Sequence, residues 1–243
     1  MVGPGWSINP WPASVAITRL RSGYWSGYSR QGTFLQLKRD DGPPVHDTSL
    51  RSLEAYTIAA KHARGTVVVI GVGMGIMPYN LCRSQEVERA IIFEPDEALR
   101  EWVRRMSAEW PGGHKLEWSD LPVAELDRTV LSRKHAVQDL PDMLYVDAQQ
   151  LDQAVLAAAD KAAALNRLVG ARMLSWCGQE MGLMAWLTQH DVDHMQLLAY
   201  KGLDQFDRWC LHLGAVVPER SRSYMRACVR VWANLRRNEG FML

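Results

Sequence analysis

Residues 67–81 read VVVIGVGMGIMPYNL, and this stretch decides the fold. Val67 to Ile70 form a short apolar, β-branched run that predicts a buried strand, and a helical pattern begins at Ile76. Between them lie Gly71, Gly73 and Gly75. A strand that breaks into glycines before a helix is typical of a nucleotide-binding turn, because glycine allows a tight turn and a close approach of the backbone to the ligand. The stretch therefore predicts a nucleotide-binding α/β fold.

Strands and helices alternate through the rest of the chain. Further predicted strands cover residues 90–93, 115–118, 143–146, 172–176, 195–200 and 223–233. The last is predicted from its period of two, because the odd positions from Met225 to Ala233 are all apolar. Strands that are separated by helices indicate a parallel sheet covered on both faces. We therefore expect a Rossmann-like, doubly wound and mostly parallel α/β sheet of about seven strands.

The first 64 residues differ in composition from the rest. Residues 1–22 are rich in Pro, Gly and Ser and predict an extended arm. Residues 24–38 predict a β-hairpin that is followed by the turn signal RDDGPP, and residues 48–64 predict a helix. We therefore divide the chain into a cap at 1–64 and a nucleotide-binding domain at 65–243.

Composition argues against several functional classes. With 28 Lys and Arg against 27 Asp and Glu, the net charge is +1, so the chain lacks the basic surplus typical of nucleic-acid binders. No apolar run approaches the roughly 18 residues of a membrane span. The four cysteines form no CxxC pair, and HDVDH at 190–194 lacks the glutamate of the HExxH motif. We expect no nucleic-acid partner, no membrane partner, no metal site and a cytoplasmic location.

Two acids follow the predicted second and third strands. Glu94 ends the second strand, where a carboxylate can accept hydrogen bonds from both hydroxyls of a ribose. Asp120 follows the third strand, where it can accept a hydrogen bond from an adenine amino group. Ile76 stands where the dinucleotide fingerprint GxGxxG has its third glycine, so the pattern does not specifically favour NAD. A surface acid at Glu94 and a helix cap at Asp120 are the alternatives.

Over residues 65–235 the chain resembles the class I S-adenosylmethionine-dependent methyltransferases, and in layout it is most similar to their spermidine synthase-like group. The resemblance lies in VVVIGVGMG, IIFEPDE, SDLPVAEL and DMLYVDAQQ. It implies S-adenosylmethionine as the cofactor. It also implies that Gly71, Gly73 and Gly75 approach its amino-acid part, that Glu94 holds the ribose and that Asp120 holds the adenine.

Asp147, after the fourth strand, is the predicted catalytic residue. It lies at the sheet edge where α/β proteins bind ligands, and a carboxylate there can take a proton from an acceptor. A helix cap is the alternative role. The spermidine synthases have a second acid three residues further on, whereas this chain has Gln150. We therefore expect methyl transfer to a small molecule. The alternatives are aminopropyl transfer, internal cyclisation of the cofactor with release of methylthioadenosine, and a non-catalytic nucleotide-binding module.

An acceptor pocket is predicted from aromatic residues and one histidine. Tyr24, Trp25 and Tyr28 in the hairpin could face a cationic group. His46 and Trp176 could line the same cleft, and packing is the alternative for these side chains. The Trp-rich hairpin is also compatible with a homodimer.

Overall fold

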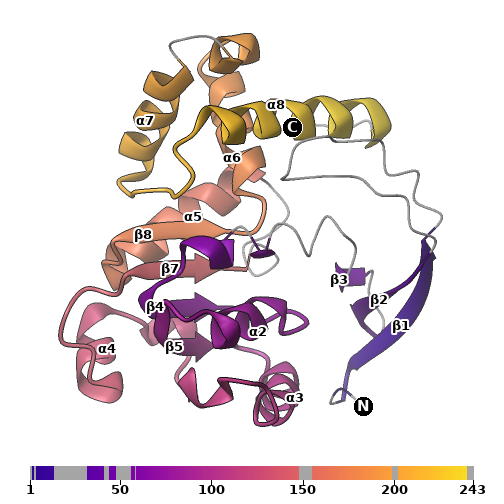
Figure 1. The fold of residues 1–243 in the computed structure, drawn as a ribbon, viewed down its shortest axis with the longest axis vertical. Coiled ribbons are helices and arrows are strands. Elements are labelled where there is room, and N and C mark those ends of the chain that lie inside the picture. Colours follow the sequence, from indigo (N-terminus) through magenta and orange to yellow (C-terminus); the bar gives the residue numbers. More distant parts are fainter. Residues whose placement is uncertain are drawn as a thin grey trace.

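The computed structural model describes residues 2, 4–13, 32–40, 44–47, 56–57, 59–147, 155–198 and 202–239. Its main feature is a parallel sheet of five strands in the order β6-β5-β4-β7-β8 (Figure 1). The strands are β4 (Gly65–Ile70), β5 (Val87–Phe93), β6 (Leu116–Ser119), β7 (Met143–Val146) and β8 (Met173–Trp176). The order runs outward from β4 in both directions, which confirms the predicted doubly wound, Rossmann-like α/β fold.

Alternation along the strands builds a core on each face of this sheet. Val67 and Val69 of β4 face one cluster, and Val68 and Ile70 face the other. All four are fully or almost fully buried, as expected for a parallel sheet covered on both sides.

Helices cover both faces. The helices are α2 (Ile76–Arg83), α3 (Glu97–Ser107), α4 (Arg128–His135), α5 (Val155–Val169), α6 (Gln179–Gln189), α7 (Gly202–Leu213) and α8 (Arg222–Glu239). Helices α2 and α3 pack on the face of Val67, together with the helical residues 56–57 and 59–62. Helices α4 to α8 contribute to the cluster on the other face. Helix α3 begins at Glu97, and the side chain of Asp96 caps it.

The N-terminal residues form a separate antiparallel sheet of three strands in the order β1-β2-β3. They are β1 (Trp6–Ala13), β2 (Gly32–Arg39) and β3 (Pro44–Asp47). Within the predicted extended arm, residues 6–13 form a strand that pairs with β2 along its whole length. Prolines at 10 and 12 hid this strand, although proline is tolerated on an edge strand such as β1. Of the predicted hairpin, residues 24–31 lie outside the described residues.

The C-terminal part differs most from the prediction, since the parallel sheet has five strands and not about seven. Of the segment predicted as a strand at 195–200, residues 195–198 belong to a 3-10 helix, His194–Leu198, and residues 199–200 lie outside the described residues. The segment at 223–233 lies within α8. In α8 the buried residues Tyr224, Met225 and Cys228 follow helical spacing, one turn apart. Apolar residues at alternate positions happened to satisfy a period of two as well, and tertiary packing selected the helix.

Two kinds of feature are absent from the described residues. They hold no group of three or more His, Cys, Asp or Glu side chains that could bind a metal ion. In the same part of the chain, no helix is both long enough and apolar enough to cross a bilayer.

Candidate functional site

The candidate site lies at the carboxyl ends of three neighbouring strands. The backbone N–H of Gly71, after β4, donates to the carbonyl of Phe93 at 2.8 Å, and the N–H of Asp147, after β7, donates to the carbonyl of Ile70 at 2.8 Å. These bonds hold the glycine turn, Glu94 and Asp147 at one edge of the sheet. The strand order reverses at β4, and open α/β sheets bind ligands in the crevice at such a point.

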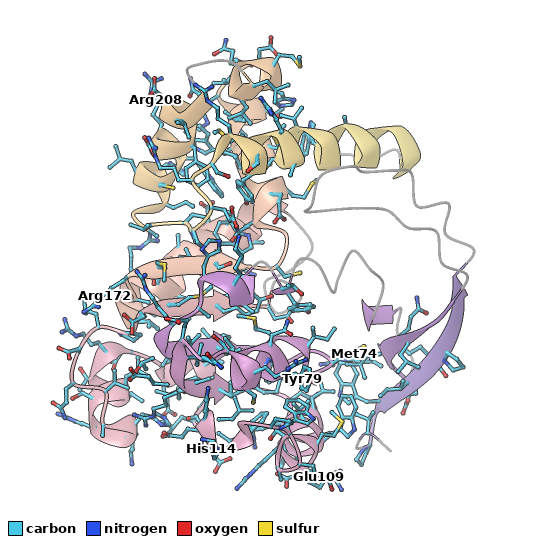
Figure 2. All side chains as sticks on the ribbon, viewed as in Figure 1. Met74, Tyr79, Glu109, His114, Arg172 and Arg208 are labelled. Atoms are coloured by element: carbon cyan, nitrogen blue, oxygen red, sulfur yellow. The ribbon has the colours of Figure 1, made fainter. Side chains whose placement is uncertain are left out.

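The glycine turn needs its glycines. Gly71, Gly73 and Gly75 have φ values of 83°, 50° and 81°, in the left-handed region that favours glycine. Gly75 also caps α2, and a Cβ there would lie 3.0 Å from Trp110 and 3.1 Å from Val103. Gly75 therefore allows the start of α2 to pack closely against α3 and the residues after it. Figure 2 shows Met74 on the side of the parallel-sheet core that faces the N-terminal sheet.

Glu94 joins the glycine turn to the start of α3. Its Oε2 accepts a hydrogen bond from the Val72 N–H, and its Oε1 accepts one from the Asp96 N–H, both at 2.9 Å. The side chain is 2% exposed. The pKa of Glu94 is raised to about 7, mainly by burial and to a smaller extent by the charges of Asp147 and Asp96, while the two N–H donors oppose the rise. Each carboxylate oxygen keeps a second lone-pair site for a ligand hydroxyl.

Asp147 is paired with an aromatic residue that sequence reasoning did not assign to the site. The Tyr56 hydroxyl donates to Asp147 Oδ2 at 2.9 Å, and both side chains are buried. Burial, with a smaller contribution from the charge of Asp147, raises the pKa of Tyr56 well above its usual value. Tyr56 therefore stays protonated at neutral pH and acts as a hydrogen-bond donor.

Asp120 lies at the end of β6 as expected, and its side chain is 79% exposed. Its Oδ1 lies 3.5 Å from the Arg100 Nε. The same guanidinium donates to the backbone carbonyl of Glu94 at 2.9 Å. Arg100 thus joins the two predicted cofactor residues.

The predicted pocket residues are not brought together within the described structure. Trp176 is 2% exposed and packs against Trp209, with ring centroids 5.6 Å apart. Trp176 is the last residue of β8 and lies in the core, which is the packing role given as the alternative. The backbone of His46 belongs to β3, and its side chain is not described. Tyr24, Trp25 and Tyr28 lie outside the described residues.

Sequence reasoning missed Tyr56, Arg100 and Trp6. Tyr56 carried a signal of burial because it lies on the apolar face of the predicted helix, but nothing local placed it beside Asp147. Trp6, on β1, donates through its Nε1 to Asp96 Oδ2 at 2.9 Å. The two residues are 90 positions apart, so no local pattern could have paired them.

Comparisons with known proteins give distant structural likenesses only. No protein-family model and no curated protein matches the chain. Among solved structures, it is similar to the CcbJ methyltransferase from Streptomyces caelestis, at 19% identity and a TM-score of 0.35, over 48% of this chain and 43% of that one. It is also similar to the Δ1-pyrroline-2-carboxylate reductase of Thermococcus litoralis, solved with NADH and L-proline, at 14% identity and a TM-score of 0.27, over 47% of this chain and 36% of that one. Both likenesses span less than half of the other protein. Similarity this low does not distinguish one cofactor from another, so the functional argument rests on the site.

Proposed function

We propose that this protein is an S-adenosylmethionine-dependent methyltransferase that acts on a small-molecule acceptor. The observation that carries the proposal is the hydrogen bond from the Val72 N–H to the buried Glu94 carboxylate, at the point where the strand order reverses. This bond sets the acid that would bind the ribose directly against a turn whose glycines allow close backbone approach.

The residues at this edge fit a cationic cofactor. Glu94 and Asp147 are 2% and 1% exposed, and the charge of Asp147 raises the pKa of Glu94, so the two carboxylates interact electrostatically. A positively charged sulfonium group is favoured near such acids, whereas the pyrophosphate of a dinucleotide is repelled. Gly71, Gly73 and Gly75 would hold the amino-acid part, Glu94 the ribose, and Asp120 the adenine.

Asp147 is the residue that we assign to the acceptor. S-adenosylmethionine, when bound, would supply an activated methyl group for the acceptor and would leave as S-adenosylhomocysteine. The sulfonium is already activated, so the chain mainly has to orient the acceptor and exclude water. Asp147, oriented by the Tyr56 hydroxyl, would accept the proton that the acceptor loses.

Calorimetric titration with S-adenosylmethionine tests the cofactor. We expect micromolar binding that Gly73→Arg abolishes, because the added side chain occupies the turn, and that Glu94→Ala weakens. Binding of NADH in place of S-adenosylmethionine would contradict the proposal. Binding of neither ligand would also contradict it.

Mass analysis of the nucleoside product tests the reaction. S-adenosylhomocysteine is the expected product, whereas methylthioadenosine would indicate aminopropyl transfer or internal cyclisation. Asp147→Asn should lose turnover, and its loss of cofactor affinity should be smaller than that of Glu94→Ala. The matched control is Asp142→Asn, just before the opposite end of β7, where the carboxylate accepts from the Thr66 N–H at 3.0 Å. That variant should keep its turnover per folded molecule. Cofactor binding without any product over a broad acceptor panel would favour a non-catalytic module.

A further inference from the structure

We propose that the N-terminal sheet completes the cofactor site, with Trp6 as a positioning residue that acts on Glu94 through Asp96. This inference rests on the proposed function, because it concerns the affinity of the same site. It assigns a role to the three-stranded sheet, which the parallel-sheet domain does not need for its own strand pairing.

The first link joins the two sheets through a single carboxylate. Trp6 Nε1 donates to Asp96 Oδ2 at 2.9 Å, while Arg39 lies opposite Trp6 in the β1–β2 register. The Arg39 guanidinium carbon is 5.1 Å from the Trp6 ring centroid, and Arg39 Nη2 is 3.8 Å from the same Asp96 oxygen. Trp6 and Arg39 therefore hold one oxygen of Asp96 from the N-terminal sheet.

The second link joins Asp96 to the ribose-binding acid. Asp96 Oδ1 accepts from the Leu99 N–H at 3.0 Å and so caps α3. The backbone N–H of Asp96 donates to Glu94 Oε1 at 2.9 Å. Because the cap fixes both the side chain and the backbone of Asp96, a change at Trp6 is transmitted to a hydrogen bond that Glu94 accepts.

Apolar packing supports the same contact. Trp6 and Ile8 of β1 pack against the cluster that contains Leu37 of β2, and Leu37 is fully buried. Met74, in the glycine turn, packs against this cluster as well. Docking of the N-terminal sheet and the conformation of the cofactor turn are therefore coupled, and by linkage each must stabilise the other.

The charged groups around Glu94 predict how the coupling between the N-terminal sheet and the cofactor site changes the pH dependence of cofactor affinity. Asp96 and Asp147 face the Glu94 carboxyl and raise its pKa, while Arg100 of α3 donates to the Glu94 backbone carbonyl. Ionised Glu94 accepts ribose hydroxyls best, so affinity should rise as the pH increases through about 7. If Asp96 loses its donor from Trp6, its negative charge is less compensated. The pKa of Glu94 then rises, and the midpoint of the affinity profile moves to higher pH.

The test is titration of the full chain with S-adenosylhomocysteine between pH 5.5 and 8.5. Trp6→Phe keeps an aromatic ring and loses the donor, so we expect about fivefold weaker binding and an upward shift of the pH midpoint. Arg39→Gln should shift the midpoint in the same direction and by less, because the Arg39 side chain is 66% exposed. Arg39→Lys keeps the positive charge, so its pH midpoint should equal that of the wild type. Ile8→Val, which trims the same strand without touching Asp96, should leave the midpoint unchanged.

Hydrogen exchange provides the reciprocal measurement. Amides of the non-proline residues in 6–13 and 32–39 should exchange more slowly when S-adenosylhomocysteine is bound, and Trp6→Phe should reduce this protection. Unchanged affinity and an unchanged midpoint in Trp6→Phe, with wild-type binding intact, would overturn the inference and leave the proposed function standing. Failure of the wild-type chain to bind would overturn the proposed function itself.

Discussion

At the residue scale, Glu94 should make stability depend on pH. Its pKa is raised from 4.5 to about 7, so the folded state keeps the proton to higher pH than the unfolded chain does. The contribution of Glu94 is therefore fully present below about pH 4.5 and is lost as the pH rises to about 7. Over that window it amounts to about 3 kcal/mol. Urea denaturation of wild type and Glu94→Gln at pH 4.5 and pH 8 measures it.

Between pH 4.5 and pH 8, Glu94→Gln should lose less stability than the wild type does. Glu97→Gln is the control, because Glu97 is an exposed residue in the first turn of α3 and its substitution makes the same chemical change close by. A wild-type loss that persists unchanged in Glu94→Gln would show that other groups cause it.

At the scale of elements, two glycine helix caps allow the energetic cost of a left-handed backbone to be measured apart from the cost of crowding an added Cβ. Gly75 caps α2 with φ 81°, and Gly178 caps α6 with φ 83°. Alanine at either position costs about 1 to 2 kcal/mol for the left-handed conformation. At Gly75 the added Cβ also meets Trp110 and Val103, whereas nothing lies within 4 Å of it at Gly178. Gly75→Ala should therefore destabilise the protein by at least about 1 kcal/mol more than Gly178→Ala does. Chemical denaturation of the two variants makes the comparison, and equal losses would contradict close packing at the glycine turn.

At the scale of the whole molecule, a buried hydrogen-bond chain attaches the C-terminal helix to the sheet. Ser175 Oγ of β8 donates to Gln179 Oε1 at 2.8 Å, and Gln179 Nε2 of α6 donates to the Tyr224 hydroxyl of α8 at 3.0 Å. Tyr224→Phe leaves this buried amide without its acceptor, so it should cost about 1 to 3 kcal/mol in the free energy of unfolding. Faster hydrogen exchange in α8 should accompany the loss.

Tyr79→Phe is the matched control for this change. Tyr79 packs edge-on against Trp110, with ring centroids 5.3 Å apart, and its hydroxyl makes no hydrogen bond within the described part of the chain. The control should therefore lie close to wild type. A similar loss in both variants would mean that the hydroxyl of Tyr224 does not secure α8.

Local sequence patterns correctly predicted those elements in which buried positions recur at a regular spacing along the strand or helix. The run at 67–70, the strand at 143–146 and the helix that begins at 76 all agree with the structure, because burial on both faces or on one stripe leaves a regular trace in the sequence. The prediction failed at 223–233, where apolar residues fit a strand and a helix equally well. Packing of α8 against α6 decided between them.

By itself, the sequence determined the parallel core, the glycine turn and the positions of Glu94, Asp120 and Asp147 after their strands. These features follow from periodicity and from the order of elements, which neighbouring residues specify. Only the tertiary structure decided that Tyr56 meets Asp147 and that Trp6 meets Asp96, across 91 and 90 residues of chain. Each of these bonds depends on how whole elements pack, so the surroundings of the predicted acids became visible only in the folded chain.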